Sequence, residues 1–174
     1  MLVTRAGSEF DSIEDLRGAV VGFSDPASTS GYIVPSVVFT EKVLDGESLN
    51  SYFGQAVFTG SHDATILGVT EGRIDAGFTW DGGIERLIIR GEIDADDLNV
   101  LWTSDPIPLD PYSYRTTLAP EIRKNIKKAF LTFHEQPESE EFFEAIKATR
   151  FVEMYDEEYD VIRALKEAKD KIRS

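Results

Sequence analysis

Residues 25–32 read Asp25-Pro26-Ala27-Ser28-Thr29-Ser30-Gly31-Tyr32, and this stretch decides the fold of the 174-residue chain. An apolar run at residues 19–23 comes before it, and apolar residues at helical spacing follow it over residues 32–43. An apolar run without polar alternation is typical of a strand that is buried on both faces of a parallel sheet. We therefore predict a buried strand, a turn rich in hydroxyl groups and a helix, in that order.

A cluster of hydroxyl residues at the start of a helix can bind an anion. The first N–H groups of a helix have no partner within it, and the helix dipole places positive partial charge there. No Lys or Arg occurs between Gly18 and Glu41, so an anion would be held by neutral donors. This favours a small tetrahedral oxyanion over a nucleic-acid backbone, whose binding depends on Lys and Arg. The alternative is that these Ser and Thr side chains only cap the helix, which is their common role.

The composition argues against several classes of protein and site. A formal net charge of −14 opposes binding to nucleic acid or to an anionic membrane. The chain has no cysteine, which excludes disulfides and thiolate metal sites, and we expect no metal or cofactor. No apolar run approaches the ~18 residues of a membrane span. The opening residues 1–5 do not resemble a signal peptide, so we expect any targeting segment of an exported parent protein to lie outside this chain.

Strands and helices alternate along the first part of the chain. Further strands are predicted at residues 2–5, 55–58, 74–78 and 98–102, and helices at residues 12–16, 62–70 and 84–89. This alternation predicts right-handed βαβ units and a parallel sheet. A hydroxyl residue follows each of the last four strands: Ser24, Thr59, Thr79 and Thr103. We expect these strand ends to converge, because ligands bind beyond the carboxyl ends of strands in open α/β sheets.

The last third of the chain is predicted to be helical, with helices at residues 121–135, 139–149 and 156–172. Its many aromatic residues are expected to pack in a core, as large apolar side chains mostly do. These helices would need a sheet to cover, and no residues that would build one are seen here. We therefore expect a homo-oligomer that associates through the C-terminal helices.

Four motifs resemble those of a known family. The chain resembles the substrate-binding proteins of phosphonate, phosphite and phosphate ABC transporters, which have the type II periplasmic binding fold. This resemblance implies an α/β lobe with a largely parallel sheet at residues 1–113, followed by C-terminal helices at residues 114–174 that would belong to the other lobe. The N-terminal half of that other lobe is then expected outside this chain. The motifs are Asp25-Pro26-x-Ser28-Thr29-Ser30-Gly31-Tyr32-x-x-Pro35, Gly60-Ser61-His62-Asp63, Gly72-x-x-Asp75-Ala76 and Trp102-Thr103-Ser104-x-x-Ile107-Pro108-x-Asp110-Pro111.

The resemblance also implies which residues bind the ligand. Ser28, Thr29 and Ser30 would clamp the oxygens of a phosphonate, and His62 would add a ring N–H. Asp81 and Asp110 would hold the amino group of an aminoalkylphosphonate. Asp81 stands where the family's aminoethylphosphonate binders have a glutamate, and this shorter side chain implies a different alkyl group or none.

The implied function is that of the solute-binding component of an ABC importer, which is not an enzyme. Its partners would be a small phosphorus oxyanion and a transporter permease, in the periplasm or outside the cell. One alternative is the sensory domain of a membrane signalling protein. Another is a hydrolase that uses a serine of residues 28–30, His62 and either Asp63 or Asp81. The absence of a Gly-x-Ser-x-Gly motif argues against the hydrolase hypothesis.

Overall fold

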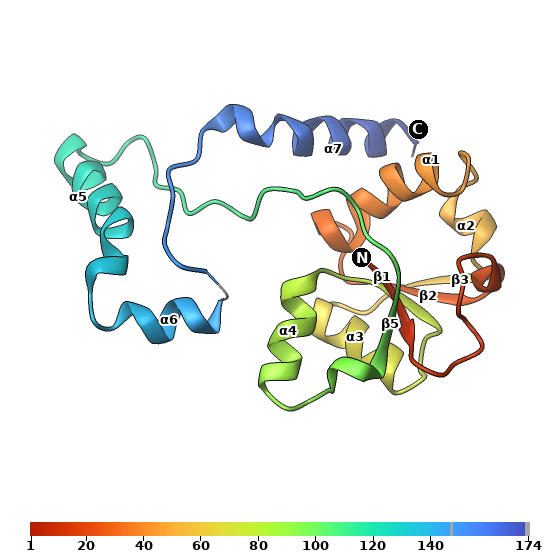
Figure 1. Ribbon diagram of the computed structural model, residues 1–174. Helices are drawn as coiled ribbons and strands as arrows, with labels where there is room; N and C mark the ends of the chain where they lie inside the picture. The colour runs from red at the N-terminus through yellow and green to blue at the C-terminus, as the bar shows by residue number, and fades with distance from the viewer. Residues whose placement is uncertain (147, 173–174) are drawn as a thin grey trace. The chain divides into compact units, whose positions relative to one another are not determined.

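The computed structural model describes residues 1–146 and 148–172. They form two compact units (Figure 1). Unit 1 comprises Met1–Pro106 together with the described part of Val161–Ser174, and unit 2 comprises Ile107–Asp160. The predicted boundary between residues 113 and 114 therefore falls within unit 2, and the last helix packs with unit 1. The assignment of residues 114–174 to a separate lobe of a longer protein stays a prediction.

Unit 1 contains a five-stranded sheet with the strand order β3-β2-β4-β1-β5. Strand β2 is parallel to β3 and β4, whereas β1 is antiparallel to β4 and β5. Four strands thus run in one direction, and the predicted largely parallel sheet is confirmed. The direction of β1 corrects the expectation of βαβ units throughout, because an apolar pattern predicts a strand but not its direction. The strands are β1 (Leu2–Arg5), β2 (Val20–Phe23), β3 (Gln55–Phe58), β4 (Ala76–Phe78) and β5 (Leu98–Trp102).

The helix predicted at residues 32–43 begins earlier and has an unusual form. It consists of two π-helical turns, η2 (Thr29–Ile33) and η3 (Pro35–Phe39), followed by α1 (Thr40–Lys42). Pro35 has no N–H and cannot make an α-helical hydrogen bond, which helps explain the wider turns. The other helical segments of unit 1 are η1 (Glu14–Leu16), α2 (Leu49–Tyr52), α3 (His62–Thr70), α4 (Asp81–Ile89), η4 (Ala95–Asp97) and α7 (Asp160–Ile172).

One face of the sheet carries an aromatic core. Phe23 of β2 and Phe78 of β4 stack with their ring centroids 5.3 Å apart. Phe39 of η3 meets Phe78 edge to face, with a centroid distance of 5.1 Å. All three side chains are fully buried. The segment Thr29–Lys42 is therefore held against the sheet by its apolar side, which leaves its first residues at the end of β2.

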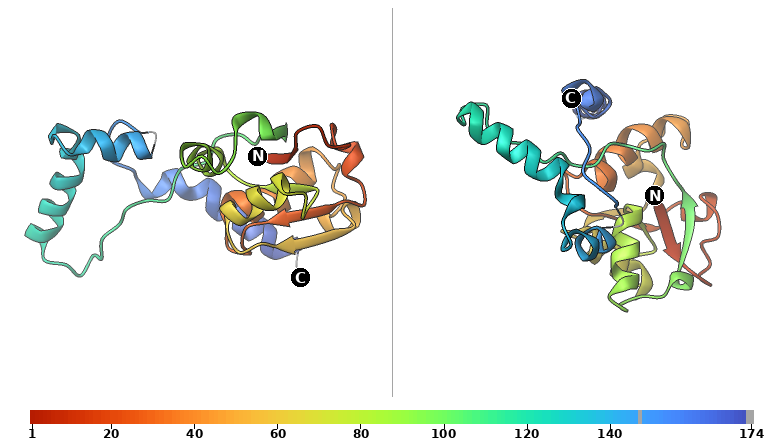
Figure 2. Two further views of the ribbon diagram at one scale, coloured as in Figure 1. Left: turned by 90° about the horizontal axis from the view of Figure 1, so that it is seen from below. Right: turned by 60° about the vertical axis from the view of Figure 1, so that its left-hand side comes forward.

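On the opposite face of the sheet, two strands present glycines to α3. Gly22 of β2 and Gly77 of β4 are register partners there. A Cβ atom on Gly77 would lie 2.5 Å from Cγ2 of Thr65 and 3.1 Å from Cγ2 of Val69, both on α3. Helix α3 therefore packs directly on the backbone of the sheet, beside α4 (Figure 1 and Figure 2).

Unit 2 is built from helices around a small aromatic cluster. Phe130, Phe133, Phe143 and Phe151 belong to a chain of ring contacts with centroid distances of 4.9–6.3 Å. The rings contact one another as predicted, but of these four only Phe143 is buried and the other three are half-buried. The predicted helix at residues 139–149 is shorter than expected, and Lys147 lies outside the described residues. The helical segments are α5 (Pro120–Leu131), η5 (Phe133–Glu135), α6 (Ser139–Ala145) and η6 (Asp156–Tyr159).

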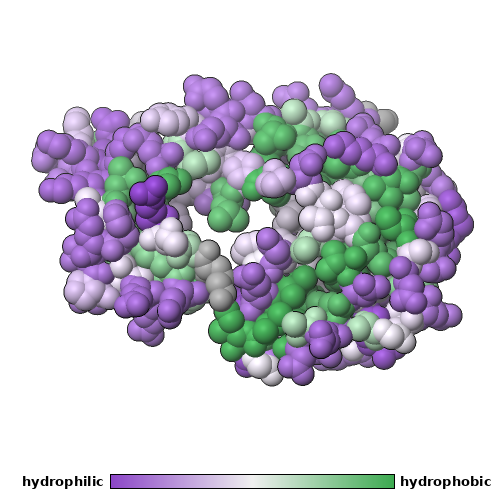
Figure 3. Space-filling view, viewed as in Figure 1, coloured by the Kyte–Doolittle hydropathy of each residue, from purple (hydrophilic) through white to green (hydrophobic). Residues whose placement is uncertain are grey.

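Other apolar side chains remain at the surface. Figure 3 shows hydrophobic side chains among the hydrophilic ones on the surface of both units. In unit 2, Leu109, Val152 and Tyr155 are each more than half exposed. Self-association through the C-terminal helices stays a prediction.

The close packing of α3 predicts unequal effects of two matched substitutions. Gly77→Ala should lower the free energy of unfolding by about 1–3 kcal/mol, because Cγ2 of Thr65 is a rigid obstacle. Gly22→Ala should cost less, since its nearest obstacle is the flexible end of Ile74, at 2.4 Å. Urea unfolding can be followed by tryptophan fluorescence, because both tryptophans, Trp80 and Trp102, lie in unit 1. Equal losses for the two variants would contradict the described packing.

Candidate anion-binding site

The hydroxyl turn, residues 25–31, leads from the end of β2 into η2 and presents polar groups there. Asp25 accepts a hydrogen bond from the N–H of Ala27 at 2.8 Å, and its carbonyl accepts one from the N–H of Ser28 at 3.0 Å. The hydroxyl oxygen of Ser28 accepts from the N–H of Gly31 at 3.1 Å. Ser28 therefore does cap the helix, as the simpler alternative predicted. Its hydroxyl proton is still available to donate to another group.

Two backbone donors of this turn have no acceptor. In residues 1–146 and 148–172, the N–H groups of Thr29 and Ser30 make no hydrogen bond. They are the first N–H groups of the helical segment, which by position have no partner within it. Together with the hydroxyl groups of residues 28–30, they can donate to the oxygens of one small anion.

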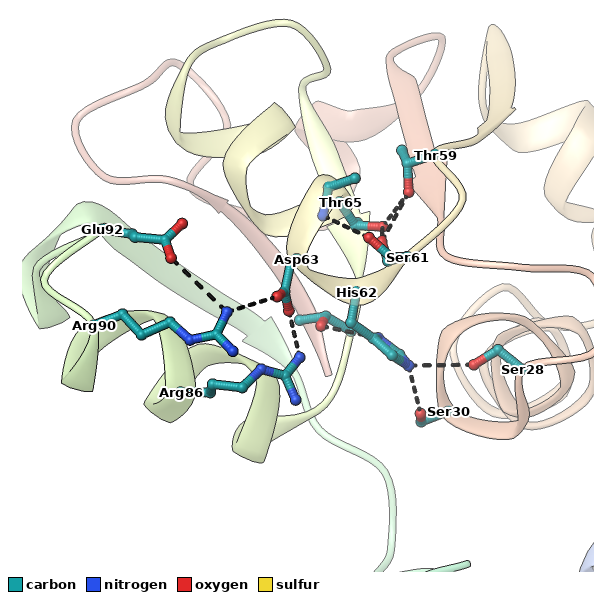
Figure 4. A network of polar contacts seen from close by, with 12 residues as sticks. Ser28, Ser30, Thr59, Ser61, His62, Asp63, Thr65, Arg86, Arg90 and Glu92 are labelled. Carbon is teal, nitrogen blue, oxygen red and sulfur yellow. Dashed lines mark hydrogen bonds and ion pairs between the residues drawn. The ribbon is translucent and has the colours of Figure 1, made fainter. Parts of the chain in front are cut away.

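His62 is brought to this turn by α3. Ser61 caps α3 by accepting a hydrogen bond from the N–H of Ala64 at 3.1 Å, and His62 is the first residue of the helix. Figure 4 shows the imidazole ring directed at Ser28 and Ser30. Its Nε2 atom lies 3.3 Å from Oγ of Ser28 and 3.4 Å from Oγ of Ser30. The structure therefore joins these predicted ligand-binding residues in one place, although their roles in binding stay predictions.

The neighbouring carboxylate of Asp63 faces away from this cluster. Figure 4 shows it directed at Arg86 of α4 and at Arg90, which directly follows α4, and both arginines form ion pairs with it. Burial lowers the pKa of His62 below its ordinary value, Arg86 lowers it further, and Asp63 opposes the shift. The ring is therefore neutral at pH 7, and it can donate a hydrogen bond through one nitrogen only.

The turn also packs tightly against the end of β2. A Cβ atom on Gly31 would lie 1.9 Å from Oγ of Ser24 and 3.0 Å from Cε1 of His62. Only glycine fits at position 31 with this backbone. The buried Ser24 hydroxyl has no hydrogen-bond partner within the described part of the chain. The expected convergence of strand ends is thus seen for Ser24, which follows β2, and for Thr79, which follows β4 and contacts His62.

The two remaining predicted ligand-binding residues are acidic and exposed. Asp81 begins α4, is exposed, and accepts a hydrogen bond from the N–H of Gly82 at 2.9 Å. Asp110 belongs to unit 2 and is also exposed. Their roles in binding an amino group stay predictions.

Sequence reasoning missed Lys169 of α7. Its side chain is 7% exposed, and its Nζ atom donates to the carbonyl oxygen of Pro26 at 2.7 Å. The same Nζ atom lies 4.9 Å from the ring centroid of Tyr32. Pro26 and Tyr32 flank the hydroxyl cluster, so a positive charge lies beside a segment that has no Lys or Arg of its own. The helical pattern alone could not identify this residue, because its partners are more than 130 residues away.

Residues 1–146 and 148–172 offer neither a metal-binding cluster nor a membrane-spanning helix. No group of three or more His, Asp or Glu side chains is arranged to hold a metal ion. No helix in these ranges combines the length and apolar character needed to cross a membrane.

The lowered pKa of His62 predicts a pH-dependent stability. As the pH falls below about 6.5, the ordinary pKa of histidine, the unfolded chain binds a proton before the folded chain does. The wild-type free energy of unfolding should therefore fall more between pH 7.5 and pH 5 than that of His62→Gln, in urea titrations followed by tryptophan fluorescence. His134→Gln, which removes the second histidine of the chain, controls for loss of an imidazole. A constant difference between wild type and His62→Gln would contradict the prediction.

The sequence is similar to that of known transporter proteins. The family model described as "ABC transporter, phosphonate, periplasmic substrate-binding protein" matches residues 1–159. The chain is 31% identical over 124 residues to the "Phosphate-import protein PhnD" of Mycolicibacterium smegmatis, covering 69% of this chain and 39% of that protein.

Solved structures share the fold. A binding protein component of an ABC phosphonate transporter from Pseudomonas aeruginosa has a TM-score of 0.85 and 27% identity, covering 98% of this chain and 57% of that one. PhnD1 from Prochlorococcus marinus, solved in complex with methylphosphonate, has a TM-score of 0.79 and 20% identity, covering 98% of this chain and 66% of that one. The predicted type II periplasmic binding fold is confirmed.

The chain spans 39% of the length of its curated relative and 57% of the first of these structures. The family model nevertheless matches residues 1–159, a range that includes the hydroxyl turn and His62. The chain therefore belongs to the family of periplasmic substrate-binding proteins of phosphonate ABC transporters.

Proposed function

We propose that this chain forms the oxyanion-binding lobe of a solute-binding protein for a phosphonate, phosphite or phosphate importer. One observation carries the proposal: the unpaired N–H groups of Thr29 and Ser30 lie in the same turn as two hydroxyl groups that face Nε2 of His62. Each of these groups can donate to an oxygen of a tetrahedral anion. Hydrogen bonds to a charged group contribute about 1.5–3 kcal/mol each, so a few of them account for firm binding.

The charges around the turn support an anionic ligand in a chain that is strongly acidic overall. Lys169 supplies a positive charge to the loop at Pro26. The carboxylate nearest to His62, that of Asp63, is paired with Arg86 and Arg90. The local field therefore opposes an anion less than the net charge of −14 suggests.

The relatives support a transport role. One is named a phosphate-import protein and another was solved with methylphosphonate. By analogy the full protein would work in the periplasm, close around its ligand and deliver it to a permease. Closure of this kind requires that the ligand bind the closed state more tightly than the open state.

The arrangement around His62 favours binding over hydrolysis. A serine hydrolase needs a carboxylate on the imidazole nitrogen that faces away from the serine. Here Nδ1 of His62 is 3.1 Å from the hydroxyl of Thr79, and Asp63 is turned toward Arg86 and Arg90. We therefore propose that the chain has no catalytic role.

The first test measures how much the hydroxyl turn contributes to the affinity for the anion. Thr29→Val should weaken binding of methylphosphonate or inorganic phosphate by about 1–3 kcal/mol, because it removes a hydroxyl donor to a charged oxygen. Calorimetric titration should use the longest natural reading frame that contains this sequence. Thr70→Val, at the other end of α3, is the control and should leave affinity unchanged. Folded protein that binds neither these anions nor phosphite would overturn the proposal.

The second test addresses selectivity. Asp110→Asn should weaken an aminoalkylphosphonate far more than phosphate or phosphite, since only the former has an ammonium group to pair with a carboxylate. Asp81→Asn should act in the same direction. Equal losses for all ligands in the same titrations would show that Asp110 serves only the turn in which it precedes a proline.

A further inference from the structure

Thr79 lies behind the hydroxyl turn, at the end of β4. Its side chain is completely buried. Its backbone is fixed by hydrogen bonds to Met1 in both directions, at 3.0 Å from its N–H and 2.9 Å to its carbonyl oxygen. Its hydroxyl oxygen lies 3.1 Å from Nδ1 of His62. Within the described part of the chain, this imidazole nitrogen is the one polar partner that the hydroxyl has.

The number of protons decides the direction of this hydrogen bond. If Nδ1 carried the proton, it would donate to Thr79, and the hydroxyl proton of Thr79 would be buried without an acceptor. An unsatisfied buried donor is costly. If Thr79 donates to Nδ1 instead, every proton has an acceptor and the ring proton lies on Nε2.

We propose that Thr79 is a positioning residue that fixes the tautomer of His62, so that Nε2–H points at Ser28 and Ser30. The hydroxyl of Thr79 donates to Nδ1, and the opposite nitrogen of the ring becomes a donor. This inference rests on the proposed function in one respect: the N–H so presented serves an oxygen of the bound anion.

The charged groups near the ring are consistent with this role. They are Arg86 of α4, Asp63 of α3 and the amino group of Met1. Asp63 accepts hydrogen bonds from Arg86 and Arg90. Among the described residues, the polar group beside Nδ1 is the hydroxyl of Thr79 and not a carboxylate, which would favour a doubly protonated, cationic ring. Burial and Arg86 lower the pKa of His62, and Thr79 orients the neutral ring, so that it acts as a directional donor and not as a charge.

Nitrogen-15 NMR of the imidazole rings tests the tautomer without any ligand. The chain has two histidines, and His134→Gln assigns the signals of His62. Wild type and Thr79→Ser should show a protonated Nε2 and an unprotonated Nδ1. Thr79→Val should shift His62 toward the other tautomer or a mixture. Thr4→Val is the matched control, because Thr4 is equally buried and its hydroxyl donates to the carbonyl oxygen of Phe10 instead.

Binding provides the second readout. Thr79→Val should weaken methylphosphonate binding about 2- to 10-fold, the value of one neutral hydrogen bond, whereas Thr79→Ser and Thr4→Val should not. A wild-type spectrum with the proton on Nδ1 would overturn the proposal even if Thr79→Val does not fold. An unchanged spectrum of folded Thr79→Val would also overturn it. The spectra require no ligand, so a protein that binds no phosphorus oxyanion but shows the expected tautomer would refute the proposed function alone.

Discussion

The close approach of α3 to the sheet is the constraint on which the site depends. Gly22 and Gly77 lie side by side on neighbouring strands and leave room for the helix to rest on the backbone. The first residue of that helix is His62, so the depth of α3 sets the position of the imidazole ring. A larger residue at position 77 would move α3, and with it the ring that faces the hydroxyl turn. Packing on one face of the sheet thereby controls polar chemistry at its edge.

The hydroxyl turn serves two purposes with the same atoms. Ser28 accepts a hydrogen bond that caps the helical segment, and its hydroxyl proton remains free to donate. The turn is held by Gly31, which packs against Ser24, and by the aromatic core beneath Phe39. A donor set fixed in this way is ordered before a ligand arrives, which reduces the entropic cost of binding. Capping and binding are therefore compatible uses of Ser28.

The electrostatics of the site are local. The chain is strongly acidic, yet the carboxylate next to His62 is neutralised by two arginines, and Lys169 brings a charge to the loop at Pro26. His62 itself stays neutral because it is buried and lies near Arg86. An anion at this turn would meet hydrogen-bond donors and a nearby cation, although the distant surface repels it. Interactions between exposed charges beyond about 10 Å are largely screened by salt. The groups close to the turn therefore determine whether an anion binds there.

The sequence by itself determined the features that depend on neighbours along the chain. The strands Gln55–Phe58 and Leu98–Trp102 and the helix His62–Thr70 have their predicted bounds, because apolar periodicity and the Ser61 cap are local signals. The motifs around the hydroxyl turn also identified the family. Only the tertiary structure decided the direction of β1, the contact of Thr79 with Nδ1 of His62 and the approach of Lys169 to Pro26. These depend on which strands pair and on where α7 packs, and side chains that are distant in sequence carry no periodic signal of such contacts.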